Sequence, residues 1–141
     1  MSRLLITILA IGFGGCIASH QSVVTDVDVR GWDQTASVEM INSDTATIRN
    51  LEIFVRYVPE MVGDSIKLTI NTIAPDSTSY DEEITIHFDT QISDRYKGVI
   101  GRYPYRKHSL LRQMGSYTVE ITPTAEVRGV EAIGINTERT E

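Results

Sequence analysis

Short stretches of strict alternation between apolar and polar residues run through most of the chain after residue 22. Three of them have their apolar positions at Ile66, Leu68 and Ile70, at Ile84, Ile86 and Phe88, and at Tyr117, Val119 and Ile121. A period of two places successive side chains on opposite faces of a strand, so each stretch predicts a strand with one buried face and one wet face. We therefore expect Leu68, Ile86, Val119 and Ile121 to point into a core.

The same kind of pattern predicts further strands elsewhere in the chain. They cover residues 23–29, 37–41, 48–58, 98–103 and 130–136. Turn-forming residues separate them, among them Asn42-Ser43-Asp44, Gly63-Asp64 and Pro75-Asp76-Ser77. No long stretch repeats every 3.6 residues. About seven to nine short strands in one domain predict an all-β fold, an antiparallel β-sandwich.

The first residues follow a different pattern, typical of a secretory signal. Arg3 precedes a mostly apolar run over residues 4–13, and Gly14-Gly15-Cys16 follows. Small residues directly before a cysteine resemble the lipobox of bacterial lipoproteins, in which the thiol is acylated and the chain is cut before it. A transmembrane anchor would need about 20 apolar residues. An ordinary signal peptide with Cys16 nearby by chance is the other alternative.

The lipobox interpretation predicts three segments. Residues 1–15 form the signal peptide, 16–22 the lipid anchor and tether, and 23–141 the β-sandwich domain. Residues 16–141 carry 12 Lys and Arg, because Arg3 lies in the signal, against 19 Asp and Glu, for a net charge of −7. This balance does not favour nucleic acid as a partner. The short tether predicts a domain held close to the membrane, which is itself the first expected partner.

A basic segment interrupts this acidic chain. Between Arg95 and Arg112 there are six cationic residues and no acidic one. The candidate partner-binding residues are Arg95, Lys97, Arg102, Tyr103, Tyr105, Arg106, Lys107 and Arg112. Tyr and Arg are frequent in the energetic centres of protein interfaces. The alternative is a charged sheet edge that resists aggregation and offsets the acidic hairpin at residues 76–89.

Other candidate chemistry is sparse. His87 and Asp89 share a strand face, but a metal site needs three or four ligands. Asp81-Glu82-Glu83 could supply calcium ligands, but it is interpreted as the charged shoulder of a hairpin. Trp32 is expected in the core, and Phe54 is either buried near the rim of the sandwich or exposed for a partner. Motifs for nucleophilic serine, zinc and phosphate chemistry are absent from the sequence. We expect no enzyme activity, cofactor, metal or catalytic residue.

Several of these features together resemble the GldH family of gliding-motility lipoproteins. They are the lipobox, Gly31-Trp32 soon after it, and Asn50-Leu51-Glu52-Ile53-Phe54-Val55. The strongest match is residues 115–121 followed by 127–138, which resembles the family's Gly-x-Tyr strand and its Val-Gly-Ile ending.

The resemblance implies a non-catalytic accessory or adaptor lipoprotein, part of an envelope complex that contains protein partners. Residues 17–19 show neither an acidic export signal nor an aspartate that retains lipoproteins at the inner membrane. We therefore expect the periplasmic face of the outer membrane. The alternative function is a glycan-binding lipoprotein of a nutrient-uptake system, with Trp32, Tyr103 and Tyr105 as its candidate aromatic residues.

Overall fold

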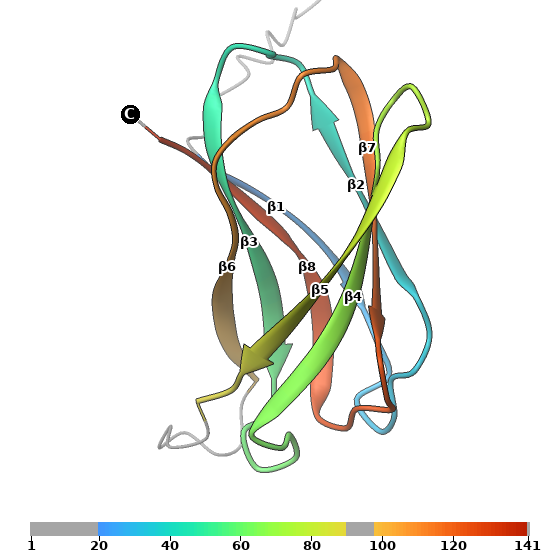
Figure 1. Ribbon diagram of the computed structural model, residues 1–141. Coiled ribbons are helices and arrows are strands. Elements are labelled where there is room, and N and C mark those ends of the chain that lie inside the picture. The colour runs from blue at the N-terminus through green and yellow to red at the C-terminus, as the bar shows by residue number, and fades with distance from the viewer. Residues whose placement is uncertain (1–19, 90–97, 141) are drawn as a thin grey trace, which may run out of the picture.

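The computed structural model describes residues 20–89 and 98–140, which form two antiparallel sheets without a helix (Figure 1). The predicted all-β sandwich is therefore confirmed. In these residues no helix has the length and apolar character that crossing a membrane requires. The strands are β1 (His20–Asp26), β2 (Ala36–Asn42), β3 (Ile48–Tyr57), β4 (Ser65–Ile73), β5 (Ser79–His87), β6 (Val99–Leu110), β7 (Gly115–Pro123) and β8 (Val130–Arg139).

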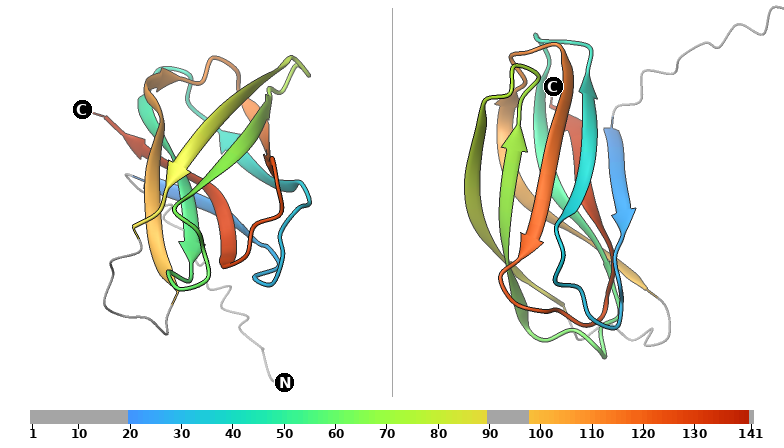
Figure 2. Two further views of the ribbon diagram at one scale, coloured as in Figure 1. Left: turned by 60° about the horizontal axis from the view of Figure 1, so that its bottom comes forward. Right: turned by 90° about the vertical axis from the view of Figure 1, so that its right-hand side faces the viewer.

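The strands pair in a nested order. β1 pairs with β8, β2 with β7, β3 with β6, and β4 with β5, all antiparallel. The chain thus forms one long hairpin with the β4–β5 turn at its tip. Pairing of β3 with β8 and of β4 with β7 joins the strands into a first sheet, β1-β8-β3-β6, and a second sheet, β2-β7-β4-β5. Eight strands in this order form a jelly roll, whose sheets face each other in Figure 2.

The core lies between the inward faces of the two sheets. Leu68, Ile86, Val119 and Ile121 are all at most 1% exposed, so the four core residues expected from alternation are confirmed. The first sheet contributes further buried side chains, namely Ile53, Val55, Tyr57, Ile133 and Ile135. Trp32 is also buried in the core, as expected, and its ring N–H donates to the Gln34 carbonyl at 2.6 Å.

Most strand boundaries differ from the sequence prediction by one to three residues, and two differences change how the chain is divided. β1 begins at His20, so residues 20–22 belong to the sandwich and not to the tether. β6 continues past Pro104 to Leu110, whereas the sequence pattern predicts its end at residue 103. Proline has no N–H to donate to a ladder, and β6 tolerates it because β6 lies at the edge of its sheet and pairs only with β3.

Candidate functional site

The basic segment of the sequence occupies edge strand β6 and the loop after it. Arg95 and Lys97 lie outside the described residues. The remaining candidates do not share one surface, because alternate side chains of a strand point to opposite faces. Arg102 is exposed on the outer face of the first sheet, whereas Tyr103 and Tyr105 point inward and pack against the core. Lys107 and Arg112 are exposed near the end of the strand and in the following loop.

Two register shifts change the direction of the middle of β6. Pro104 pairs with Glu52, but the next pair on β3 joins Leu51 to Arg106, so Tyr105 is an extra residue. A second shift lies between Arg106 and Ser109, where His108 has a positive φ of 52°. Bulges of this kind redirect side chains at sheet edges. Here they bring Tyr105 and Arg106 to the inner side of the sheet, towards β5.

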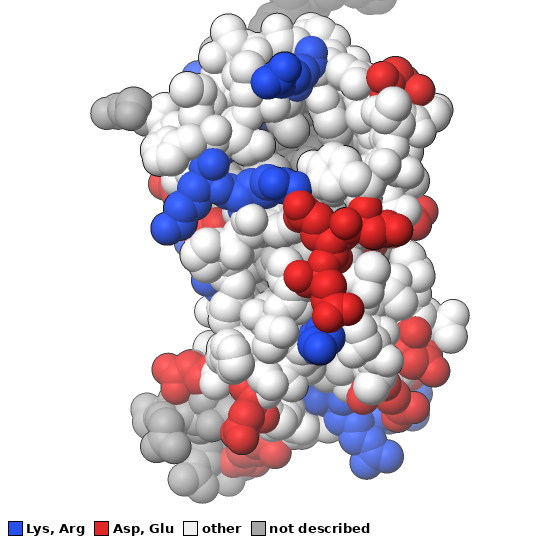
Figure 3. Space-filling view, in the orientation of Figure 1, with Lys and Arg blue, Asp and Glu red and all other residues white. Residues whose placement is uncertain are grey.

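Arg106 links the edges of the two sheets. Its guanidinium forms an ion pair with Glu82 on β5 and lies 5.3 Å from the ring centroid of Tyr80 and 5.5 Å from that of Tyr105. Figure 3 shows cationic and acidic side chains meeting on this side of the molecule. Arg106 is therefore a structural contact between β6 and the acidic β5 strand. This ion pair fits the sheet-edge interpretation of the basic segment.

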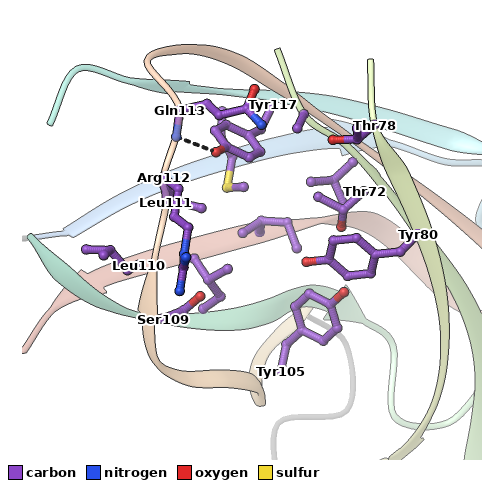
Figure 4. Close-up of a pocket in the computed structure, with 15 residues that line it drawn as sticks. Thr72, Thr78, Tyr80, Tyr105, Ser109, Leu110, Leu111, Arg112, Gln113 and Tyr117 are labelled. Carbon is purple, nitrogen blue, oxygen red and sulfur yellow. Dashed lines mark hydrogen bonds between the residues drawn. The ribbon is translucent and has the colours of Figure 1, made fainter. Parts of the chain in front are cut away.

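A pocket opens between β5 and β6, above this contact (Figure 4). Its volume is about 310 Å³. Tyr80 and Tyr105 project into it from opposite edges, and the Tyr117 hydroxyl accepts a hydrogen bond from the Gln113 N–H at 3.0 Å. The apolar floor is formed by Met40, Leu51, Val119 and Ile135, and the rim by Thr78, Ser109, Arg112 and Gln113. An apolar floor with a few polar groups at its rim is the usual composition of a small-molecule site.

Tyr103 and Tyr105 are neutral, packed side chains. Burial raises the pKa of Tyr105 to about 12, and burial likewise raises the pKa of Tyr103. The Tyr103 ring meets the edge of Phe88 with centroids 6.4 Å apart, and Phe88 lies 4.7 Å from the ring of Tyr57. Tyr103 therefore extends an aromatic cluster at the end of the core and does not face solvent as a binding platform.

The other candidates from the sequence occupy separate places. His87 is exposed at the end of β5, and the described residues contain no group of three or more His, Cys, Asp or Glu that could hold a metal ion. Glu82 and Glu83 form ion pairs with Arg106 and Lys67, which fits the expected charged hairpin. Trp32 lies at the other end of the sandwich from the pocket, bridged to Val127.

A second surface, on the outer face of the first sheet, was only partly anticipated. The strand register places Val24, Gly134, Phe54 and Arg102 in one row across β1, β8, β3 and β6. We call these four residues the Phe54 row. Phe54 is partly exposed, and Arg102 makes no side-chain hydrogen bond or ion pair with any described residue. The sequence singles out Phe54 because it shares a strand face with the polar residues Glu52 and Arg56. Which residues of the other strands lie beside it depends on the strand register.

Polar contacts border this row on both sides. On one side, Ser22 donates to Asn136 at 2.7 Å, and Asn136 donates to Glu52 at 2.9 Å. On the other side, the Arg56 guanidinium bonds to Glu131 at 3.0 Å. The bordering side chains are therefore satisfied within the fold, whereas the Phe54 row leaves apolar area and one cation available.

Comparison with known proteins adds no identification. No protein-family model matches the chain, and no curated protein matches it.

Proposed function

We propose that the chain is a lipid-anchored, non-catalytic accessory or adaptor component of a bacterial envelope complex. Acylated Cys16 holds it in the outer membrane on the periplasmic face, and the jelly roll presents a protein-binding surface. The resemblance to GldH lipoproteins supports this proposal, as do the lipobox and the fold that begins four residues after Cys16.

The observation that carries the adaptor role is the difference between the two outer faces of the sandwich. The outer face of the second sheet carries mostly polar side chains, with the apolar Ile41 and Ile73 towards one end of their strands; the polar ones are Ser37, Glu39, Lys67, Thr69, Asn71, Thr118, Glu120 and Thr122. That is the usual composition of a solvated sheet face. The first sheet instead exposes Val24, Arg102 and part of Phe54 from the Phe54 row, with Ile100 beside them at 54% exposure. An aromatic ring, aliphatic side chains and an arginine that forms no ion pair with any described residue are typical of the centre of a protein interface.

Two substitutions in this row test the proposal. Phe54→Ser with Arg102→Glu should abolish co-purification of the protein partners that wild-type protein retains after extraction from its membrane. The matched control is Ile73→Ser with Lys67→Glu, which removes one apolar side chain and reverses one charge on the outer face of the second sheet. Thermal unfolding of both variants checks that the fold persists. Equal partner recovery with the Phe54 row variant and with wild type would reject this surface.

The anchor is tested separately. Cys16→Ser should leave the protein as uncut precursor or release it from the membrane, because a chain without its acyl groups has no apolar anchor. Mature, membrane-bound Cys16→Ser protein would contradict the lipid-anchor proposal.

The pocket between β5 and β6 favours a second candidate function, binding of a glycan by an envelope lipoprotein. Of the three aromatic residues considered for this role, Trp32 and Tyr103 are packed into the fold, and only Tyr105 lines the pocket. Tyr80, at 50% exposure, provides the second ring. Calorimetric titration with a panel of oligosaccharides should then give heat with wild type and none with Tyr80→Ala. Heat that persists in Tyr80→Ala, or its absence in wild type, would reject this candidate.

A further inference from the structure

The two ends of the sandwich differ in the side chains that they expose. We call one of them the anchor end, formed by the start of β1 and the loops at residues 43–47, 74–78 and 111–114. His20 is the partner of Glu138 in the sheet, so the beginning of β1 and the end of β8 meet there (Figure 2). The loops at residues 27–35, 58–64 and 124–129 form the opposite end.

Four large apolar side chains are exposed at the anchor end. They are Ile41 at 67%, Met114 at 59%, Ile48 at 45% and Leu110 at 42%. Ile48 and Leu110 are direct partners on β3 and β6 in the first sheet. Ile41 belongs to β2 and Met114 directly precedes β7, so both lie at the end of the second sheet. Exposed apolar side chains concentrated in one place mark an interaction surface.

The position of these pairs restricts what can cover them. The β6–β7 loop crosses from one sheet to the other between them, and Asn42 holds it by donating to the carbonyls of Leu111 and Gln113 at 3.1 and 2.9 Å. Because the pairs belong to opposite sheets, a partner against one outer face would reach only one pair. A surface that lies across the end of the sandwich reaches both.

We propose that the anchor end rests on the bilayer that holds acylated Cys16, with Ile41, Ile48, Leu110 and Met114 in the interface between lipid headgroups and acyl chains. This inference rests on the proposed lipid anchor at Cys16. Three residues lie between Cys16 and His20, and four extended steps along the chain span at most about 14 Å. The anchor extends from the start of β1, at the anchor end. Because it is this short, it keeps the anchor end next to the bilayer, and Ile41, Ile48, Leu110 and Met114 meet the lipid.

Charge favours the same orientation. The loops of the opposite end carry five acidic residues, Asp28, Asp33, Glu60, Asp64 and Glu126, against two cations, Arg30 and Arg128. Anionic lipid headgroups would repel that end. At the anchor end, Arg112 and Arg139, which headgroup phosphates attract, stand against Asp44, Asp76 and Glu138, so this end is the less acidic of the two. The outer face of the first sheet then stands upright from the membrane, where the Phe54 row is open to a partner.

Fluorescent labelling at the two ends tests this orientation. Acylation consumes the thiol of Cys16, the only cysteine, so Met114→Cys and Gly63→Cys each provide a single free thiol. Gly63 lies at the opposite end, and a Cβ there meets nothing within 4 Å. Each full-length, acylated variant is labelled with a polarity-sensitive dye and reconstituted in phosphatidylethanolamine–phosphatidylglycerol vesicles that contain lipids with a shallow nitroxide quencher. We expect strong quenching at residue 114 and none at residue 63.

A matched pair of variants tests the apolar contacts themselves. In the Met114→Cys protein, Ile48→Ser with Leu110→Ser should weaken quenching, whereas Ile100→Ser, at the other end of β6, should leave it unchanged. Equal quenching at both labelled ends, no quenching at residue 114, or an unaltered signal in the double serine variant would overturn the orientation.

Mass spectrometry of the N-terminal peptide separates failure of the orientation from failure of the proposed function. A lipid-modified Cys16 without quenching at residue 114 rejects the orientation alone. An unmodified Cys16 rejects both.

Discussion

Gly134 is the position at which one added methyl group should disturb the fold most directly. It lies on β8 opposite Val24 of β1, in the middle of the Phe54 row. A Cβ at residue 134 would lie 2.0 Å from the carbonyl oxygen of Val23 and 2.7 Å from the Cα of Val24. Both are backbone atoms, so no side-chain rotation relieves the overlap.

The size of the effect follows from the distance that β1 must move. Ordinary contacts of a Cβ begin at 3.4 Å, so β1 would retreat by about 1.4 Å from Gly134. A shift of that size breaks the neighbouring ladder hydrogen bonds between β1 and β8. Overpacking typically costs about 1–3 kcal/mol and each lost hydrogen bond about 1 kcal/mol, so we expect Gly134→Ala to lower the free energy of unfolding by about 2–4 kcal/mol. For a domain of this size, each kcal/mol corresponds to about 3–6 °C in the unfolding midpoint.

Denaturant unfolding and hydrogen exchange together measure this effect. The control is Gly63→Ala, because a Cβ there meets nothing within 4 Å, and its stability should match or slightly exceed that of wild type. In Gly134→Ala, amides of β1 should exchange faster while those of β4 and β7 change little. A Gly134→Ala protein within about 0.5 kcal/mol of wild type, with unchanged exchange in β1, would refute the reasoning.

Three further predictions concern the core and the contact between β5 and β6. Ile121→Ala should lower the free energy of unfolding, measured in urea, by about 2–5 kcal/mol, and Val119→Ala should lower it by about 2 kcal/mol or less. A loss below about 1 kcal/mol for Ile121→Ala would contradict the burial of Ile121. A double-mutant cycle with Arg106→Gln and Glu82→Gln should give a coupling of about 1 kcal/mol that weakens at high salt, because both side chains are about one-third exposed. The pKa of Tyr105 is near 10 in the unfolded chain and about 12 in the folded chain. Between about pH 10 and pH 12 the unfolded state therefore binds fewer protons than the folded state. The free energy of unfolding should fall as pH rises through that interval. Tyr105→Phe should make this fall shallower, and an unaltered profile would argue against burial as the cause.

The strands were predictable because their signal is local. Alternation around Leu68, Ile86, Val119 and Ile121 identifies a buried face from neighbouring residues alone, and all four are buried. The continuation of β6 past Pro104 was not predictable in the same way. Whether a proline fits in a strand depends on whether that strand lies at the edge of a sheet, and the edge position depends on the pairing of distant strands.

The candidate site was less predictable than the fold. A run of cations and tyrosines at residues 95–112 indicated a surface, but bulges in β6 bring Arg106 to Glu82 and Tyr105 into a pocket. The Phe54 row gathers residues from four strands, and Val24 and Arg102 are 78 positions apart in the sequence. Only register aligns them, and a slip of one residue in any strand would move its member of the row to the other face.

The sequence by itself determined that the chain after its first residues forms strands, which side of most strands is buried, and where a lipobox-like cysteine stands. These properties depend on residues close together in the chain. The tertiary structure decided which strands lie at the edges, which charges neutralise each other, and which apolar residues remain exposed at the anchor end and on the first sheet. Those outcomes depend on nested pairings between residues up to 118 positions apart, such as His20 and Glu138, and such pairings leave no local pattern in the sequence.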